Sequence, residues 1–227
     1  MSQKTPAREM LPVWTPYVAP FVLFLLLTGV EGEFTRYYPI LYTVKIALVG
    51  GLLLGMRRVS PPEVRPHGNG LGVAVLAGVL LVFAWVWVDQ HSPHLALMGK
   101  RVAYDPFRQI GDPMARAAFL AVRFFGLVVI VPLIEETFYR GFLLRFVTDM
   151  DDWRRVPVGT FSPAALAANV VLFALSHPEW LSAAIFAVAM CGLLARTKNL
   201  FACVAAHAVT NLLLGLYVIH TGAWQYW

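Results

Sequence analysis

The sequence predicts an all-α membrane protein, a polytopic bundle of seven to eight transmembrane helices that encloses an intramembrane cavity. Of its 227 residues, 59% are hydrophobic and 14% are charged, whereas a soluble domain carries about a quarter charged and slightly under half apolar residues. The apolar residues form blocks such as VAPFVLFLLLTGV and GLGVAVLAGVLLVFAWVWV. Such blocks approach the roughly 20 residues that a helix needs to cross a bilayer. One block would also fit a buried helix of a soluble core, but six or seven would not.

The predicted spans cover residues 14–30, 40–56, 70–88, 163–176, 181–195 and 200–220. Another apolar stretch, residues 115–147, is too long for one straight span, since it would measure about 50 Å at ~1.5 Å per residue. It contains Pro132, so we expect a break or kink there, or a helix that leaves the bilayer. The polar residues 89–116 predict a loop with a short interfacial helix. We expect one integral membrane domain, residues 1–227, with a motif-bearing core at about 115–220.

The net charge of +5 is interpreted as topology control, because the lysines and arginines fall between apolar blocks. No basic stripe with interleaved aromatic residues indicates nucleic-acid binding. With seven crossings, the largest basic clusters share one side, which should be cytoplasmic and leave the C-terminus outside. They are Lys4/Arg8, Arg57/Arg58/Arg65, Arg145/Arg154/Arg155 and Arg196/Lys198. We expect an uncleaved first span, a multi-pass protein of the cell membrane, and as partners the lipid bilayer and a protein or peptide substrate.

Two kinds of residue in the apolar stretches are assigned no chemistry. Cys191 and Cys203 have no CxxC or zinc-ribbon spacing and are expected to be buried free thiols. Arg123 and Asn169 are candidates for lining the same cavity, but snorkelling or helix packing is the favoured interpretation of each, and Lys45 is interpreted as a bystander. The C-terminal sequence TGAWQYW has no CaaX box, so the chain is not expected to be a prenylation substrate itself.

Charged residues within membrane helices are costly and usually functional, and the first such group is IEETFYRGF. On a helix, Glu136 and Arg140 lie four residues apart on one face, while Glu135 points about 100° away. Arg140 is therefore expected to fix Glu136, leaving Glu135 free to act on water. A simple ion pair would account for Glu136 and Arg140 but would leave Glu135 unexplained.

Two further groups follow along the chain. His177 in FALSHPEW comes at the end of an apolar helix, where a histidine alone is more often a helix cap than a catalyst. His207 and Asn211 in AAHAVTNLLL lie four apart on one face of an apolar helix, where they serve equally well as polar contacts between helices. Together with Glu135, these residues supply what peptide hydrolysis requires. Glu135 and His177 would hold and deprotonate a water molecule, and His207 and Asn211 would donate hydrogen bonds to the oxyanion.

The three groups, in this order, resemble the CAAX protease and bacteriocin-processing family, also called the abortive-infection family. EETFYR fits its EExxxR motif, FALSH its FxxxH motif and HAVTN its HxxxN motif, all within residues 120–215. The resemblance implies a bundle of about eight membrane helices and an endoprotease, and the family includes the type II CAAX prenyl endopeptidases. It implies that Glu135 and His177 activate water, that His207 and Asn211 form the oxyanion site, that Glu136 and Arg140 support the geometry, and that Phe173 packs beside His177.

Several alternatives remain open at this point. The resemblance implies a metal-independent glutamate protease without a cofactor, although two histidines and two glutamates would also suit zinc. The substrate, lipidated or not, is undetermined. A non-catalytic membrane scaffold or immunity-type protein would use the same residues for stability or partner binding. A transporter would use them as a proton or ion path, but the sequence shows no inverted repeat.

Overall fold

The structure is a computed structural model and describes residues 11–227; Lys4 and Arg8 lie outside this range. Within it the chain forms eight helices and no strands, with helix over 76% of the residues, as the sequence predicts. The helices are α1 (Thr15–Glu33), α2 (Tyr38–Gly55), α3 (Leu71–His91), α4 (Pro106–Gln109), the continuous helix α5–α7 (Pro113–Thr148), α8 (Pro163–Leu175), α9 (Trp180–Thr197) and α10 (Leu200–Thr221). Six of them are long and apolar enough to cross a membrane, and α8 is a shorter apolar helix.

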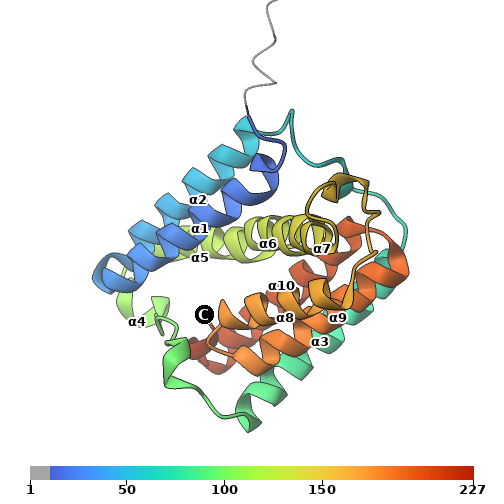
Figure 1. The fold of residues 1–227 in the computed structure, drawn as a ribbon. Coiled ribbons are helices and arrows are strands. Elements are labelled where there is room, and N and C mark those ends of the chain that lie inside the picture. Colours follow the sequence, from blue (N-terminus) through green and yellow to red (C-terminus); the bar gives the residue numbers. More distant parts are fainter. Residues whose placement is uncertain (1–10) are drawn as a thin grey trace, which may run out of the picture.

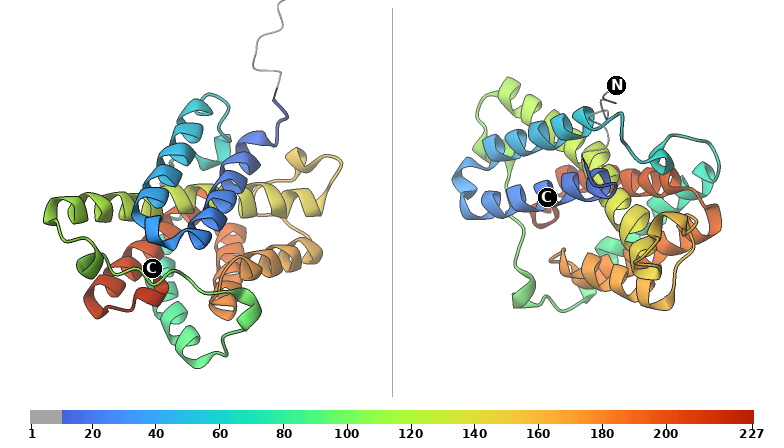
Figure 2. Two further views of the ribbon diagram at one scale, coloured as in Figure 1. Left: turned by 90° about the vertical axis from the view of Figure 1, so that its left-hand side faces the viewer. Right: turned by 45° about the horizontal axis from the view of Figure 1, so that its top comes forward.

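The long helix α5–α7 runs through the middle of the bundle (Figure 1). The antiparallel pair α1 and α2 packs against one side of it, and α3, α8, α9 and α10 form a layer on the other. Both views of Figure 2 show the same division. Within the second layer, α10 packs on α3 most extensively. The backbones approach closely at Gly78, where an added Cβ atom would lie 2.5 Å from the Ala206 carbonyl oxygen. This packing fixes α10, the helix that carries His207 and Asn211.

Of the three outcomes expected at Pro132, a break, a kink or a helix that leaves the bilayer, the break does not occur. The helix from Pro113 to Thr148 is continuous over 36 residues. Its regular α-helical turns, α5 (Pro113–Phe125), α6 (Val131–Glu136) and α7 (Leu144–Thr148), are joined by two wider π-helical segments, Gly126–Ile130 and Thr137–Leu143. The first of these segments directly precedes Pro132. A π-helical turn therefore accommodates the proline that would clash within a regular α-helix.

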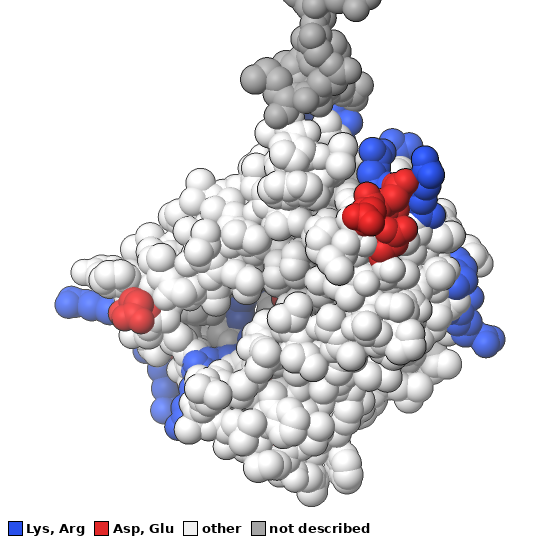
Figure 3. Space-filling model, in the orientation of Figure 1, with Lys and Arg blue, Asp and Glu red and all other residues white. Residues whose placement is uncertain are grey.

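The outer surface of the bundle is apolar, as the membrane prediction requires. Large hydrophobic side chains of α1, α2 and α3, among them Leu26, Ile40, Leu54 and Phe83, are exposed. Figure 3 shows a broad uncharged surface, with lysine, arginine and acidic side chains gathered at its margins. Exposed apolar area on this scale indicates contact with lipid. The chain is a multi-pass membrane protein.

Three basic loops meet at one end of the bundle, as the sequence predicts for a seven-span topology. Arg145 donates to Glu63 at 2.6 Å, which joins the loop before α3 to the end of α7. Lys198 Nζ donates to the Gly159 carbonyl at 2.6 Å. The side chain of Asn199, at the start of α10, donates to the loop before α3 through the Asn69 carbonyl at 2.6 Å. The predicted loop at 89–116 runs across the other end and contains the four-residue helix α4.

Candidate active site

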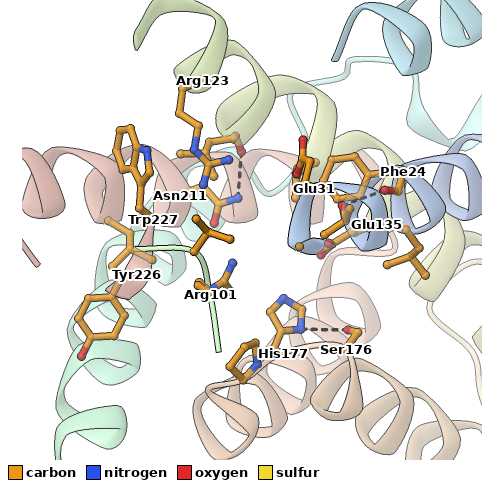
Figure 4. A pocket seen from close by; sticks show the side chains of 18 of the residues that line it. Phe24, Glu31, Arg101, Arg123, Glu135, Ser176, His177, Asn211, Tyr226 and Trp227 are labelled. Atoms are coloured by element: carbon orange, nitrogen blue, oxygen red, sulfur yellow. Dashed lines mark hydrogen bonds between the residues drawn. The ribbon is translucent and has the colours of Figure 1, made fainter. Parts of the chain in front are cut away.

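A cavity of about 280 Å³ lies between the long helix and the second layer of helices. The four residues predicted to carry the chemistry all line it: Glu135, His177, His207 and Asn211. They come from three elements that are far apart in the sequence, α6, the turn after α8, and α10. Figure 4 shows Glu135 and His177 pointing into the same space from opposite sides. The structure therefore assembles the sequence-predicted residues around one cavity.

The two adjacent glutamates have different surroundings. Glu136 is fully buried and does not line the cavity. Its Oε1 atom accepts hydrogen bonds from Arg140 Nη1 at 3.4 Å and from His207 Nδ1 at 2.8 Å. Glu135 lines the cavity, and its Oε2 atom is buried with no hydrogen-bond partner among the described residues. The predicted ion pair between Glu136 and Arg140 is confirmed, and so is the different direction of Glu135.

His207 is oriented by Glu136. Because the carboxylate can only accept, Nδ1 of the imidazole donates to it, and Nε2 is the nitrogen that faces Glu135, with 4.0 Å between Nε2 and Glu135 Oε2. The ring of Phe186 packs edge-on against the imidazole, with centroids 4.9 Å apart. The imidazole is thus held between two carboxylates, with one nitrogen committed to structure and the other directed toward the cavity.

Asn211 stabilises the backbone next to Pro132. In the π-helical segment, the Val131 N–H bonds to the carbonyl five residues earlier, at Gly126. The next bond of this series would join residue 132 to the Leu127 carbonyl, but proline has no N–H. The Leu127 carbonyl instead accepts from Asn211 Nδ2 at 2.9 Å. This bond explains why Pro132 leaves no unsatisfied carbonyl in an apolar helix, and it leaves the second N–H of the amide for a ligand in the cavity.

His177 is held at the cavity by hydrogen bonds and by ring packing. Its Nδ1 lies 2.8 Å from the Phe173 carbonyl oxygen. Since a carbonyl only accepts, Nδ1 carries the proton and Nε2 presents a lone pair. The Phe173 ring stacks on the imidazole at 4.5 Å between centroids, as predicted, and Trp85 packs edge-on at 5.7 Å. Burial and the nearby Arg101 guanidinium lower the pKa of His177 to about 4, so the imidazole is neutral at physiological pH.

Arg101 and Glu179 form an ion pair that the motifs do not reveal. Arg101, in the segment between α3 and α4, donates from Nε and Nη2 to the two oxygens of Glu179, at 2.9 and 3.0 Å. Glu179 follows His177 by two residues, so the pair ties this segment to the turn that carries the histidine. Burial alone would raise the pKa of Glu179, but the guanidinium outweighs it and lowers that pKa. The two residues are 78 positions apart, so local spacing in the sequence does not predict the pair.

Further ionisable residues line the cavity away from the four motif residues. Lys45 forms a buried ion pair with Glu31, a residue to which the sequence assigned no role. Arg123 is buried and also lines the cavity. Lys45 and Arg123 therefore face the cavity inside the bundle, whereas a bystander would lie away from the cavity and a snorkelling residue would reach toward the membrane surface. Asn169, by contrast, has the predicted packing role, since its side chain donates to the Tyr139 carbonyl at 2.8 Å.

Cys191 and Cys203 are free and buried, as predicted. Among residues 11–227, no three side chains of the types His, Cys, Asp and Glu are grouped closely enough to hold a metal ion.

Residues 117–213 match the family model described as type II CAAX prenyl endopeptidase Rce1-like. The match covers 97 of the 227 residues and includes all three motifs. No curated protein and no solved structure shows significant similarity to the chain. The description of this family model agrees with the resemblance that the three motifs indicate.

The unequal surroundings of the two glutamates predict unequal effects on stability. Glu136→Gln should lower the free energy of unfolding by roughly 3–5 kcal/mol, because it leaves the buried Arg140 without an opposite charge. Glu135→Gln should have little effect or a stabilising one, because it removes a buried charge that has no hydrogen-bond partner on Oε2. Unfolding of both variants in detergent measures the difference. Equal losses of stability would contradict the division of roles.

The position of Arg101 predicts a shift in the titration of His177. Arg101→Gln should raise the pKa of His177 from about 4 toward its ordinary value of 6.5, because a nearby positive charge is removed. NMR titration of the imidazole measures the shift. Arg108→Gln, a change at an exposed arginine of the same segment, is the matched control and should leave the midpoint unchanged. An unchanged midpoint in Arg101→Gln would rule out this electrostatic coupling.

Proposed function

We propose that this chain, whose motif-bearing core is that of the Rce1-like type II CAAX prenyl endopeptidases, is an intramembrane endopeptidase that hydrolyses a peptide bond with activated water. The proposal rests on the position and the hydrogen bonding of Glu135. It is a buried carboxylate that lines a cavity in the membrane domain, with one oxygen unpartnered and two histidines lining the same cavity. A structural ion pair does not account for this carboxylate, since its neighbour Glu136 already binds Arg140.

In the proposed reaction, a water molecule lies between Glu135 and His177. The lone pair on His177 Nε2 accepts one hydrogen bond from the water, and Glu135 takes a proton as the water oxygen attacks the substrate carbonyl carbon. The peptide C–N bond then breaks, and Glu135 returns the proton to the leaving amine. The products are a new carboxylate and a new amine, and the protein returns to its starting state. The neutrality of His177 at physiological pH suits this role.

The oxyanion of the tetrahedral intermediate is assigned to α10. The second N–H of Asn211 is free for this purpose, because the first is bound to the Leu127 carbonyl. His207 Nε2 is the second donor, and it donates when the ring carries a proton on each nitrogen, since Nδ1 already donates to Glu136. Both donors are fixed before substrate binds, so little reorganisation accompanies the reaction. Glu136, Arg140 and Phe173 act as positioning residues.

The substrate is proposed to be a membrane-associated or lipidated protein or peptide, cut near its C-terminus. This choice rests on the family match and on the apolar surroundings of the cavity, which admit a chain held at the bilayer. The proposed location is the cell membrane.

Purified protein in lipid vesicles tests the reaction. Wild-type protein should cleave a prenylated peptide with a short C-terminal extension, and Glu135→Gln should lower the rate by at least about a thousandfold, the scale expected for losing the essential base. Cleavage is followed by mass spectrometry of the released peptide. Leu26→Ala, a change at an exposed side chain of α1, is the control for reconstitution and should keep the wild-type rate. Full activity of a folded Glu135→Gln protein would contradict the proposed mechanism.

The cavity lining includes Lys100, Arg101 and Val102, in the segment that runs across the end of the bundle opposite the three basic loops. The positive-inside rule therefore predicts access from the non-cytoplasmic side. A cysteine introduced at Lys100, which lines the cavity and is exposed, should react with a membrane-impermeant maleimide in intact cells. A cysteine at the exposed Arg196, near the basic loops, should react only after the membrane is permeabilised. Burial of Cys191 and Cys203 keeps the background low. The reverse labelling pattern would place the cavity on the cytoplasmic side.

A further inference from the structure

One charged side chain in the cavity lacks the partner that its burial requires. Arg123 is 6% exposed, and a buried guanidinium is normally paired with an acidic group or fully hydrogen-bonded. Among the described residues, Arg123 makes no salt bridge within 4.0 Å, and its Nε atom is buried without a hydrogen-bond partner. The other buried charges that line the cavity all have an oppositely charged or ionisable group within that distance. They are Glu31 with Lys45, Arg101 with Glu179, and Glu135 with His207.

Aromatic rings hold the Arg123 guanidinium in place. Its Cζ atom lies 4.5 Å from the centre of the Tyr42 ring and 5.2 Å from the centre of the Trp227 ring. The hydroxyl of Tyr42 also donates to the Arg123 backbone carbonyl, at 3.3 Å. Contacts of this kind use the flat faces of the guanidinium. Tyr42 also forms a hydrogen bond with the guanidinium, whereas Nε has no partner among the described residues. Arg123 is therefore fixed by packing and by Tyr42, while part of its hydrogen-bonding edge, including Nε, remains available.

The available edge lies in the same cavity as the proposed catalytic residues. In Figure 4, Arg123, Asn211 and Trp227 lie on one side of the cavity, across from Glu31 and Phe24. Asn211 bonds to the Leu127 carbonyl, and Leu127 is four residues, or about one helical turn of ~6 Å, from Arg123 on the same helix. Arg123 therefore lies about one helical turn from the backbone to which Asn211, the proposed oxyanion donor, is bonded. A few residues of extended peptide, at ~3.3 Å each, span this distance.

We propose that Arg123 binds the free C-terminal carboxylate of the substrate and thereby selects the peptide bond to be cut, a short distance before the chain end. This assignment rests on the proposed function. A carboxylate presents two oxygens that match the guanidinium fork, and one bound anion would neutralise the excess positive charge of Arg123 beside the balanced pair of Lys45 and Glu31. A substrate that continues past this point would have no charge to offer and would leave Arg123 unpaired.

The test compares two forms of one farnesylated peptide, ending in a free carboxylate or in a primary amide, with protein in lipid vesicles. Wild-type protein should cleave the acid at least about tenfold better in kcat/KM, mainly through KM, because the charge-assisted bond is lost in the amide. Equal cleavage of the two forms would overturn the assignment while leaving the proposed function standing. Cleavage of neither form by the wild-type protein would count against the proposed function itself.

Variants of Arg123 sharpen the test. Arg123→Gln should abolish the preference, so that the acid and the amide are cleaved at the same rate. Thermal unfolding of the variant in detergent shows whether it is folded. Arg123→Lys should recover part of the preference, since lysine supplies the charge without the fork. Arg116→Gln, on the same helix but outside the cavity lining, is the matched control. A preference for the acid that survives in folded Arg123→Gln would overturn the proposal.

A third peptide distinguishes the chain end from an acidic side chain. It carries the C-terminal amide but has aspartate as its last residue. Under the proposal it should be cleaved no better than the plain amide, because the α-carboxylate is the group that is recognised. Recovery of cleavage by the aspartate side chain would overturn the assignment to the chain end.

Discussion

The hydrogen bonds of Glu136 are the constraint on which the arrangement of the site depends. One oxygen of this fully buried carboxylate accepts from Arg140 on its own helix and from His207 on α10. In an apolar bundle a buried charge without such partners would cost several kcal/mol, so the two helices are held in one register. The same bonds decide which nitrogen of His207 faces the cavity. With Glu136 committed to structure, its neighbour Glu135 is free for chemistry.

The backbone depends on the site residues as much as the site depends on the backbone. Asn211 supplies the hydrogen bond that the Leu127 carbonyl loses because of Pro132. Its partner on α10, His207, makes the other polar contact to the long helix through Glu136. Two residues one turn apart on α10 thus join that helix to two points on the long helix. Because unsatisfied polar groups are costly in the membrane, the same contacts serve folding and the proposed catalysis.

Local spacing made much of this predictable from the sequence. Glu136 with Arg140, Phe173 with His177, and His207 with Asn211 are each four residues apart, a separation that a helix converts into a shared face. The apolar blocks likewise predicted the helices to within a few residues, including the turn that carries His177, although α8, predicted as a span, is shorter than the six helices long enough to cross a membrane. The roles of these residues in a reaction remain predictions, since position alone does not test them.

Contacts between distant segments were not predictable in this way. A break at Pro132 was among the expected outcomes, because Asn211, which bonds to the Leu127 carbonyl in place of the missing N–H, lies 79 positions further along the chain. Arg101 and Glu179 are separated by 78 residues, and Arg123 has its ring contacts with residues of α2 and of the segment after α10. A charge within an apolar stretch leads one to expect a partner. Only the packing of the helices identifies that partner, or shows that the described residues supply none.

Glu135 is proposed to activate the water that hydrolyses peptide bonds in the membrane. A comparison of membrane proteomes tests this role most directly. Cells that express the wild-type protein or Glu135→Gln at equal levels are compared for new peptide termini in their membrane proteins. A defined set of new peptide termini should appear with the wild-type protein and be absent with Glu135→Gln. The same termini in both samples, with both proteins folded in the membrane, would contradict this role.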